Sequence, residues 1–145
     1  MDHFPKWCGI IIHHTACRDD PKAFDSNAIQ HHHLSMGYLD IGYNFLFEKV
    51  DQDIWMIGGR PLTMKGAHAL GYNETHIGIT FVGDFELEVP HPSLLIFAGP
   101  YIQALVNAYK ISLSEIKRHS DVNITNCPGK YFPFDKLMML LKEAA

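Results

Sequence analysis

Hydrophobic positions in the first 82 residues of this chain predict two buried strands and one hairpin. Residues 8–14 and 77–82 are short apolar runs rich in β-branched side chains, which is typical of strands covered on both faces. Residues 43–48 and 53–57 are two further strand-like runs separated by a few residues. Their spacing predicts an antiparallel hairpin that turns at residues 50–52.

Two other segments have apolar residues at helical spacing and contain no internal helix breaker. The first covers residues 26–36, where Asp25 or Ser26 can cap the helix and Gly37 can end it. The second covers residues 134–145 and is amphipathic, so one of its faces should turn inward. The inward residues are expected to be Leu137, Met138, Leu140 and Leu141.

A third helical segment contains a proline. Pro92 suits the first turn of a helix, and helical spacing continues over residues 94–109. Because an interior proline removes a hydrogen bond and clashes with the preceding turn, Gly99-Pro100 predicts a kink or two short helices. A short strand is expected after this segment, at residues 115–119.

The order of these elements predicts an α/β (α+β) fold. Strands and helices alternate irregularly, which favours a central mixed β-sheet flanked by helices. The chain has 145 residues, 47% of them hydrophobic, so it can bury a core of its own. It contains no internal repeat or linker-like stretch, and residues 1–145 are therefore expected to form a single domain.

The charge balance excludes some classes of partner. Twelve Lys and Arg residues stand against 16 Asp and Glu residues, which gives a net charge of −4. This sign disfavours nucleic-acid binding, since most of that affinity comes from neutralising phosphates. No apolar run approaches the length of a membrane-spanning helix, so no membrane insertion is expected. The first residues lack the pattern of a signal peptide, which predicts synthesis in the cytoplasm.

Histidine is unusually frequent, and one combination of residues could bind a metal. The ten histidines outnumber each of the other basic residue types, since there are nine lysines and three arginines. Histidine is the commonest metal ligand. His13 ends the first predicted strand, His119 ends the short late strand, and Cys127 follows eight residues later, before Pro128-Gly129. Two imidazoles and one thiolate suit zinc, and three protein ligands leave a fourth tetrahedral position for water, as in catalytic sites.

Simpler interpretations of these residues remain open at this point. The three candidate ligands could be unrelated core or surface residues, because their spacing matches no compact zinc motif. Residues 31–33 are three histidines on a predicted helix, and we expect a helix surface with His33 turned partly inward. Cys8 and Cys17 are expected to be small buried residues. Tyr43 could be an ordinary strand aromatic, and the residues around 72–73 could form only a turn.

Five short motifs, in order along the chain, carry a family resemblance. They are Ile-Ile-Ile-His-His-Thr-Ala at 10–16, Asp-Ile-Gly-Tyr-Asn-Phe at 40–45, Gly-Ala-His with Gly-Tyr-Asn at 66–73, Ile-Gly-Ile with Val-Gly-Asp at 77–84, and His-Ser-Asp-Val through Cys-Pro-Gly at 119–129. Together they resemble the type-2 N-acetylmuramoyl-L-alanine amidases, which include phage lysozymes of amidase type and peptidoglycan recognition proteins. The resemblance runs from about residue 9 to residue 137.

This resemblance implies roles for individual residues. The family's zinc ligands match His13, His119 and Cys127, and its catalytic tyrosine matches Tyr43. Strand alternation would send the neighbouring His14 to the opposite face. Thr125 stands where the phage lysozymes carry a lysine, so it offers a hydroxyl donor to a developing oxyanion without a positive charge. The residues expected in the substrate cleft are His68, Tyr72 and Asn73.

The function implied by the resemblance is zinc-dependent hydrolysis of the amide between N-acetylmuramic acid and L-alanine of peptidoglycan. One Zn²⁺ per chain is expected, and the protein is expected to be a monomer. A phage endolysin that reaches the cell wall after holin-type release is favoured over a bacterial wall-recycling enzyme, which usually has aspartate at the position of Cys127. Two alternatives on the same fold are a non-catalytic peptidoglycan-binding module and an RNA polymerase-binding regulator.

Overall fold

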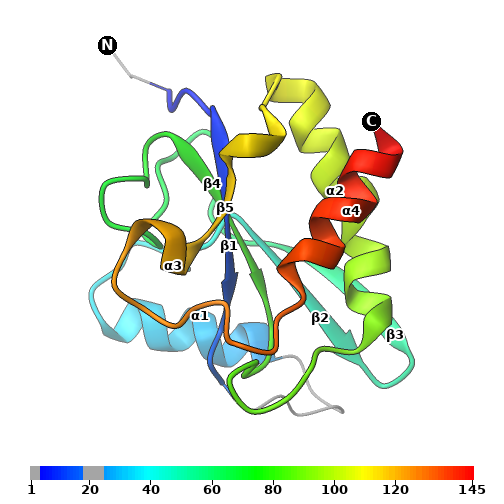
Figure 1. Ribbon diagram of the computed structural model, residues 1–145. Coiled ribbons are helices and arrows are strands. Elements are labelled where there is room, and N and C mark those ends of the chain that lie inside the picture. The colour runs from blue at the N-terminus through cyan, green and yellow to red at the C-terminus, as the bar shows by residue number, and fades with distance from the viewer. Residues whose placement is uncertain (1–3, 18–24) are drawn as a thin grey trace.

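The computed structural model describes residues 4–17 and 25–145, and its centre is one mixed five-stranded sheet (Figure 1). The strand order is β3-β2-β4-β1-β5. Strands β2 and β3 are antiparallel and form the expected hairpin, whereas β4 runs parallel to both β2 and β1, and β5 runs parallel to β1. The strands are β1 (Gly9–His14), β2 (Phe45–Val50), β3 (Asp53–Gly58), β4 (His76–Phe81) and β5 (Ile116–Arg118).

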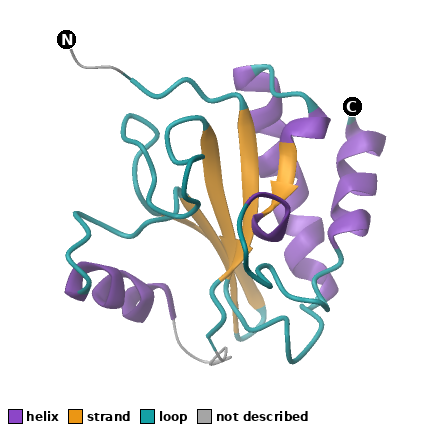
Figure 2. Ribbon diagram, turned by 60° about the vertical axis from the view of Figure 1, so that its left-hand side comes forward, coloured by secondary structure: helices purple, strands orange, loops and turns teal. Residues whose placement is uncertain are grey.

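Helices cover both faces of the sheet (Figure 2). Helix α1 (Asp25–Ser35) lies on one face, and α2 (Pro92–Tyr109) packs with α4 (Phe134–Ala144) on the other. A 3₁₀ turn, η1 (Leu113–Glu115), leads into β5. A single turn of helix, α3 (His119–Val122), follows that strand. Across residues 4–17 and 25–145, no helix is long and apolar enough to cross a lipid bilayer.

Side-chain alternation divides the sheet into a core face and a second face. Ile10, Ile12 and Ile79 belong to the main hydrophobic core under α2 and α4. Because successive strand residues point to opposite faces, His13 and its register partner Thr80 lie on the α1 side. All six residues of β1 and all six of β4 are buried, as their continuous apolar runs predict.

The burial of α4 confirms the inward face predicted for this helix. Leu137 and Leu141 of α4 are fully buried, and Met138 and Leu140 are half-buried against the same core. Helix α1 ends at Ser35, and Gly37 follows with a φ of +89°, a left-handed conformation that suits glycine after a helix.

Of the two alternatives expected around Pro100, two short helices are wrong, because α2 is one continuous helix from Pro92 to Tyr109. The kink stays a prediction. Pro100 is exposed, and Ile96, whose carbonyl would receive the missing hydrogen bond, is also on the exposed side. Water can hydrate that carbonyl, while Leu95 and Ile102 anchor the opposite side of the helix in the core. Tertiary packing therefore outweighs the local cost of the proline.

Two smaller expectations also need correction. Cys8 and Cys17 are exposed rather than buried, because each lies just outside β1 instead of within it. His119 does not end the short strand, since β5 stops at Arg118 and His119 is the first residue of α3.

Candidate metal centre

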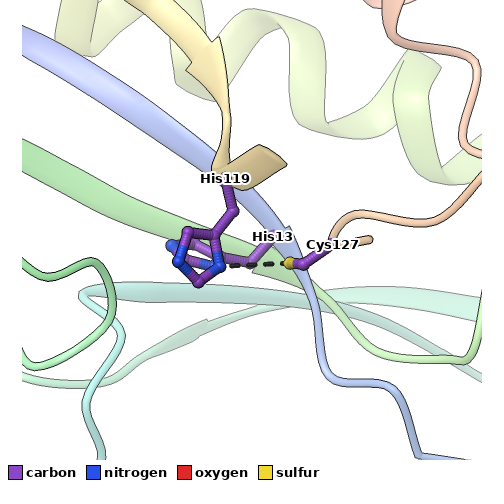
Figure 3. A group of neighbouring side chains, drawn as sticks. All are labelled: His13, His119 and Cys127. Atoms are coloured by element: carbon purple, nitrogen blue, oxygen red, sulfur yellow. Dashed lines mark hydrogen bonds between the residues drawn. The ribbon is translucent and has the colours of Figure 1, made fainter. Parts of the chain in front are cut away.

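Three side chains from distant segments converge at the end of β1 (Figure 3). His13 comes from β1, His119 from the start of α3, and Cys127 from the loop before α4. One potential ligand atom from each lies within 4.8 Å of the others. The His13 Nδ1 to Cys127 Sγ distance is 3.5 Å. A tetrahedral zinc ion with ordinary Zn–N and Zn–S bond lengths would hold these two atoms about 3.6 Å apart.

Burial sets the protonation states of the three groups. His13 is 1% exposed, and its pKa is well below the ordinary value because of burial and the neighbouring His68 and His119. Burial also lowers the pKa of His119. Burial raises the pKa of the Cys127 thiol to about 12, although the backbone N–H of His14 acts in the opposite direction. The cluster thus offers two neutral imidazoles and a thiol that ionises readily only when a cation binds, which fits zinc.

Hydrogen bonds orient the His119 imidazole and the Cys127 thiol. His119 Nε2 lies 2.9 Å from the side-chain oxygen of Asn123, which can only accept a hydrogen bond. His119 therefore carries its hydrogen on Nε2 and keeps a lone pair on Nδ1. Cys127 Sγ accepts a hydrogen bond from the backbone N–H of His14 at 3.3 Å. Figure 3 shows that the resulting orientation points all three side chains at a common space.

Tyr43 lies against these three side chains, two residues before β2 begins. Its ring centroid is 5.1 Å from the His13 ring and 5.6 Å from the ring of His33 on α1. Burial and the nearby Cys127 raise the pKa of Tyr43 above its ordinary value of 10.0. The phenol therefore stays protonated and can donate a hydrogen bond.

The residue after Tyr43 holds that segment in place. Asn44 is 1% exposed, and its side chain accepts from the N–H of Gly78 and donates to the carbonyl of Arg60. The buried guanidinium of Arg60 donates to three backbone carbonyls in the flanking loops, those of Asp40, Ile41 and Lys65. These bonds satisfy buried backbone groups and fix the loop that carries Tyr43.

An open cleft of about 700 Å³ borders the group of candidate ligands formed by His13, His119 and Cys127. His119, His68 and Asn73 all line it. Asn73 uses its side-chain oxygen to accept from the backbone N–H groups of His68 and Ala69, so it shapes the loop of the cleft. The ring of Tyr72 packs edge-on against His76, 5.0 Å between centroids. Of the three residues expected in the substrate cleft, His68 and Asn73 line this cleft, and His68 also contacts His13.

Thr125 is half-buried in the loop of Cys127. Its hydroxyl oxygen accepts from the backbone N–H of Cys127 at 3.2 Å. The hydrogen of the hydroxyl remains free for another acceptor, so this bond does not prevent the donor role inferred from the sequence.

Other neighbours of the site were less visible in the sequence. His33 is turned partly inward as expected, and its Nδ1 accepts from the N–H of Gly42 beside Tyr43. Asn123 was not singled out, although it stands four residues after His119, a spacing at which side chains share a helix face. The contact between His13 and His68 had no local signal, because 55 residues separate the two.

Comparison with known proteins identifies the family to which the chain belongs. The family model described as N-acetylmuramoyl-L-alanine amidase matches residues 4–130. The chain belongs to this amidase family. The matched region contains all three candidate ligands, and members of the family are typically zinc-dependent.

Similar proteins of the amidase family include both hydrolases and recognition proteins. Peptidoglycan-recognition protein SC1a of Drosophila melanogaster is 35% identical over 127 residues, covering 83% of this chain and 67% of its own length. The endolysin N-acetylmuramoyl-L-alanine amidase LysCS of Clostridium intestinale has a TM-score of 0.80 at 30% identity, covering 94% of this chain and 84% of that one. Peptidoglycan recognition protein LE bound to tracheal cytotoxin, a monomeric diaminopimelic acid-type peptidoglycan, has a TM-score of 0.75 at 31% identity, covering 91% and 79%.

Proposed function

We propose that this amidase-family protein is a zinc-dependent hydrolase that cleaves the amide between N-acetylmuramic acid and L-alanine in peptidoglycan. The observation that carries the proposal is the convergence of His13, His119 and Cys127 beside an open cleft. His119 belongs both to the cluster and to the lining of the cleft, so a bound substrate would reach the metal directly. Three protein ligands and one accessible side are typical of catalytic rather than structural zinc.

The donor set has a defined chemical consequence. Zinc, when bound, supplies a Lewis acid and brings the pKa of a coordinated water to roughly 7. Cys127 would contribute a negative charge, while the two imidazoles stay neutral because burial lowers the pKa of each. The backbone N–H of His14 would continue to donate to the Cys127 sulfur after the thiol loses its proton.

Tyr43 and Thr125 are the proposed donors to the carbonyl oxygen of the scissile amide. When water adds to the carbonyl carbon, negative charge develops on that oxygen, and fixed donors lower the barrier. The raised pKa of Tyr43 keeps its proton available for this purpose. The second step breaks the C–N bond; both protons of the added water end on the leaving nitrogen, so the products are a lactyl carboxylate and the ammonium group of L-alanine.

Peptidoglycan is the proposed partner, bound along the cleft next to His68 and Asn73. The structural similarity to a recognition protein bound to a peptidoglycan fragment supports this choice. Tyr72 packs on His76 next to the same loop, and its predicted contact with substrate remains a prediction.

The proposed biological setting is phage lysis. The similarity to the endolysin LysCS supports an enzyme that is made in the host cytoplasm and acts on the wall after holin-type release. We propose that the protein acts there as a monomer.

Digestion of purified peptidoglycan, followed by mass spectrometry of the products, tests the proposed function. We expect free stem peptides that begin with L-alanine and glycan strands that keep intact lactyl carboxylates. A zinc chelator should abolish this release, and added Zn²⁺ should restore it. Cys127→Ser should lose zinc and activity together, whereas the matched variant of an exposed cysteine, Cys8→Ser, should keep both.

Two results would contradict the proposal. Full activity of Cys127→Ser with one equivalent of bound zinc would show that the ligand assignment is wrong. Retention of the protein on peptidoglycan without any product release would instead identify a recognition module on the same fold.

A further inference from the structure

His68 contacts the metal cluster through its ring rather than standing free in the cleft. Its Nδ1 lies 2.8 Å from Nε2 of His13, and its Nε2 lies 3.0 Å from the backbone carbonyl oxygen of His76 on β4. The two rings meet edge to face, with centroids 4.9 Å apart. His68 is thus held at both of its nitrogens.

These two contacts determine where the hydrogens lie. The carbonyl of His76 can only accept, so the Nε2 of His68 must carry a hydrogen. A neutral imidazole has one N–H, and the contact with the His76 carbonyl places that hydrogen on Nε2. Its Nδ1 must therefore accept from the Nε2–H of His13. His13 is left with a bare Nδ1, the atom that lies 3.5 Å from Cys127 Sγ.

The ring of His68 packs closely against two glycines. A Cβ atom built on Gly78 of β4 would lie 2.5 Å from Cδ2 of the His68 ring, and one built on Gly66 would also lie 2.5 Å from it. A side chain at either glycine would therefore collide with the imidazole in its observed position. The side chain of Asn73 fixes the backbone of His68 from the other side through two hydrogen bonds.

From this geometry we infer that His68 is a positioning residue, which selects the tautomer and orientation of His13 in which Nδ1 can bind zinc. His68 acts through His13, and this role is separate from contact with substrate. The inference rests on the proposed function only in assuming that zinc is the metal. Partners of this kind commonly change metal affinity roughly 10–100-fold when they are removed.

Three substitutions separate positioning from packing. His68→Ala removes both hydrogen bonds. In His68→Asn, the side-chain oxygen can stand close to the former Nδ1 and accept from His13, but no group reaches the carbonyl of His76. In His68→Gln, the amide extends to the former Nε2 and can donate to that carbonyl, but the acceptor for His13 is lost. His31→Ala, at an exposed histidine on α1, is the control.

Zinc affinity is measured by competition with a chromophoric chelator, and cobalt(II) absorption reports the geometry of the ligands. We expect His68→Ala and His68→Gln to bind zinc roughly 10–100-fold more weakly than the unaltered protein, with a changed cobalt spectrum. His68→Asn should stay within about threefold of it, because the acceptor for His13 is retained. His31→Ala should match the unaltered protein. Thermal unfolding of each metal-free variant monitors the fold.

Affinities that are equal in all three His68 variants would overturn the inference, whether they match the unaltered protein or fall together with thermal stability. An affinity of His68→Gln above that of His68→Asn would also overturn it, because packing and the bond to His76 would then matter more than the acceptor for His13. If the unaltered protein binds zinc but releases no peptide, only the proposed function fails. If it binds no zinc, both fail.

Discussion

Replacing Tyr43 with phenylalanine separates catalysis from folding in a single change. Tyr43→Phe keeps the ring that packs against His13 and His33 and deletes only the hydroxyl. Zinc binding should be unaffected, because the three candidate ligands, His13, His119 and Cys127, are all retained. What is lost is a donor whose raised pKa keeps it protonated beside the candidate ligands.

The two expected effects differ in size. A hydrogen bond contributes about 0.5–1.5 kcal/mol net to folding, so the free energy of unfolding should fall by no more than about 1.5 kcal/mol. A donor to a developing oxyanion is worth about 2.7–4 kcal/mol of barrier, which corresponds to a loss of roughly 100- to 1000-fold in kcat. Since the ring continues to fill its place, KM should change much less than kcat.

Release of peptide from dye-labelled peptidoglycan measures kcat and KM, and metal analysis of the same samples measures bound zinc. Tyr109→Phe is the control, because Tyr109 is exposed and ends α2, on the opposite face of the sheet from the candidate ligands. The control should stay within a few-fold of the unaltered protein. A Tyr43→Phe protein with unchanged kcat and full zinc would refute the donor role and, with it, the proposed division of labour between metal and phenol.

Three further changes test stability. Asn44→Ala should lower the free energy of unfolding by about 2–6 kcal/mol in urea denaturation, because it leaves the Gly78 N–H and the Arg60 carbonyl buried without their partner. Leu137→Ala should cost about 2–5 kcal/mol in the same assay, since this fully buried side chain would leave a cavity. Burial raises the pKa of Glu48 above 4.5, so its stabilising contribution is complete below that pH and is lost as the pH rises through the folded-state pKa. Glu48→Gln should therefore reduce the decline in stability above pH 4.5.

The sheet could be predicted from the sequence because its central strands have an unambiguous pattern. Interior parallel strands are covered on both faces, so β1 and β4 are expected to be mostly apolar, and residues 10–12 and the alternating Ile77, Ile79 and Phe81 meet this expectation. Pro100 shows the limit of such local reasoning. The cost of a proline depends on whether water can reach the freed carbonyl, and exposure on one side of α2 is a property of the tertiary fold.

The three candidate metal ligands could be predicted from the sequence for a different reason. Zinc chemistry restricts the residue types, and His13, His119 and Cys127 were candidates on chemical grounds before the family resemblance supported them. The hydrogen-bond partners of the cluster were not accessible in the same way. His68 reaches His13 only because β4 lies beside β1 and because Gly78 has no side chain, which are facts of sheet order and register.

The candidate ligands are held by contacts that need no metal. Cys127 is tied to β1 by the N–H of His14 and to α3 by its own carbonyl, which accepts from the N–H of Ser120 at 2.8 Å. His119 is held by Asn123, and His13 belongs to a buried strand. In small zinc-stapled domains, by contrast, metal binding provides the folding energy itself. Here a large hydrophobic core lies under α2 and α4, so a bound metal would not have to supply the folding energy, and its three ligands could leave one side open.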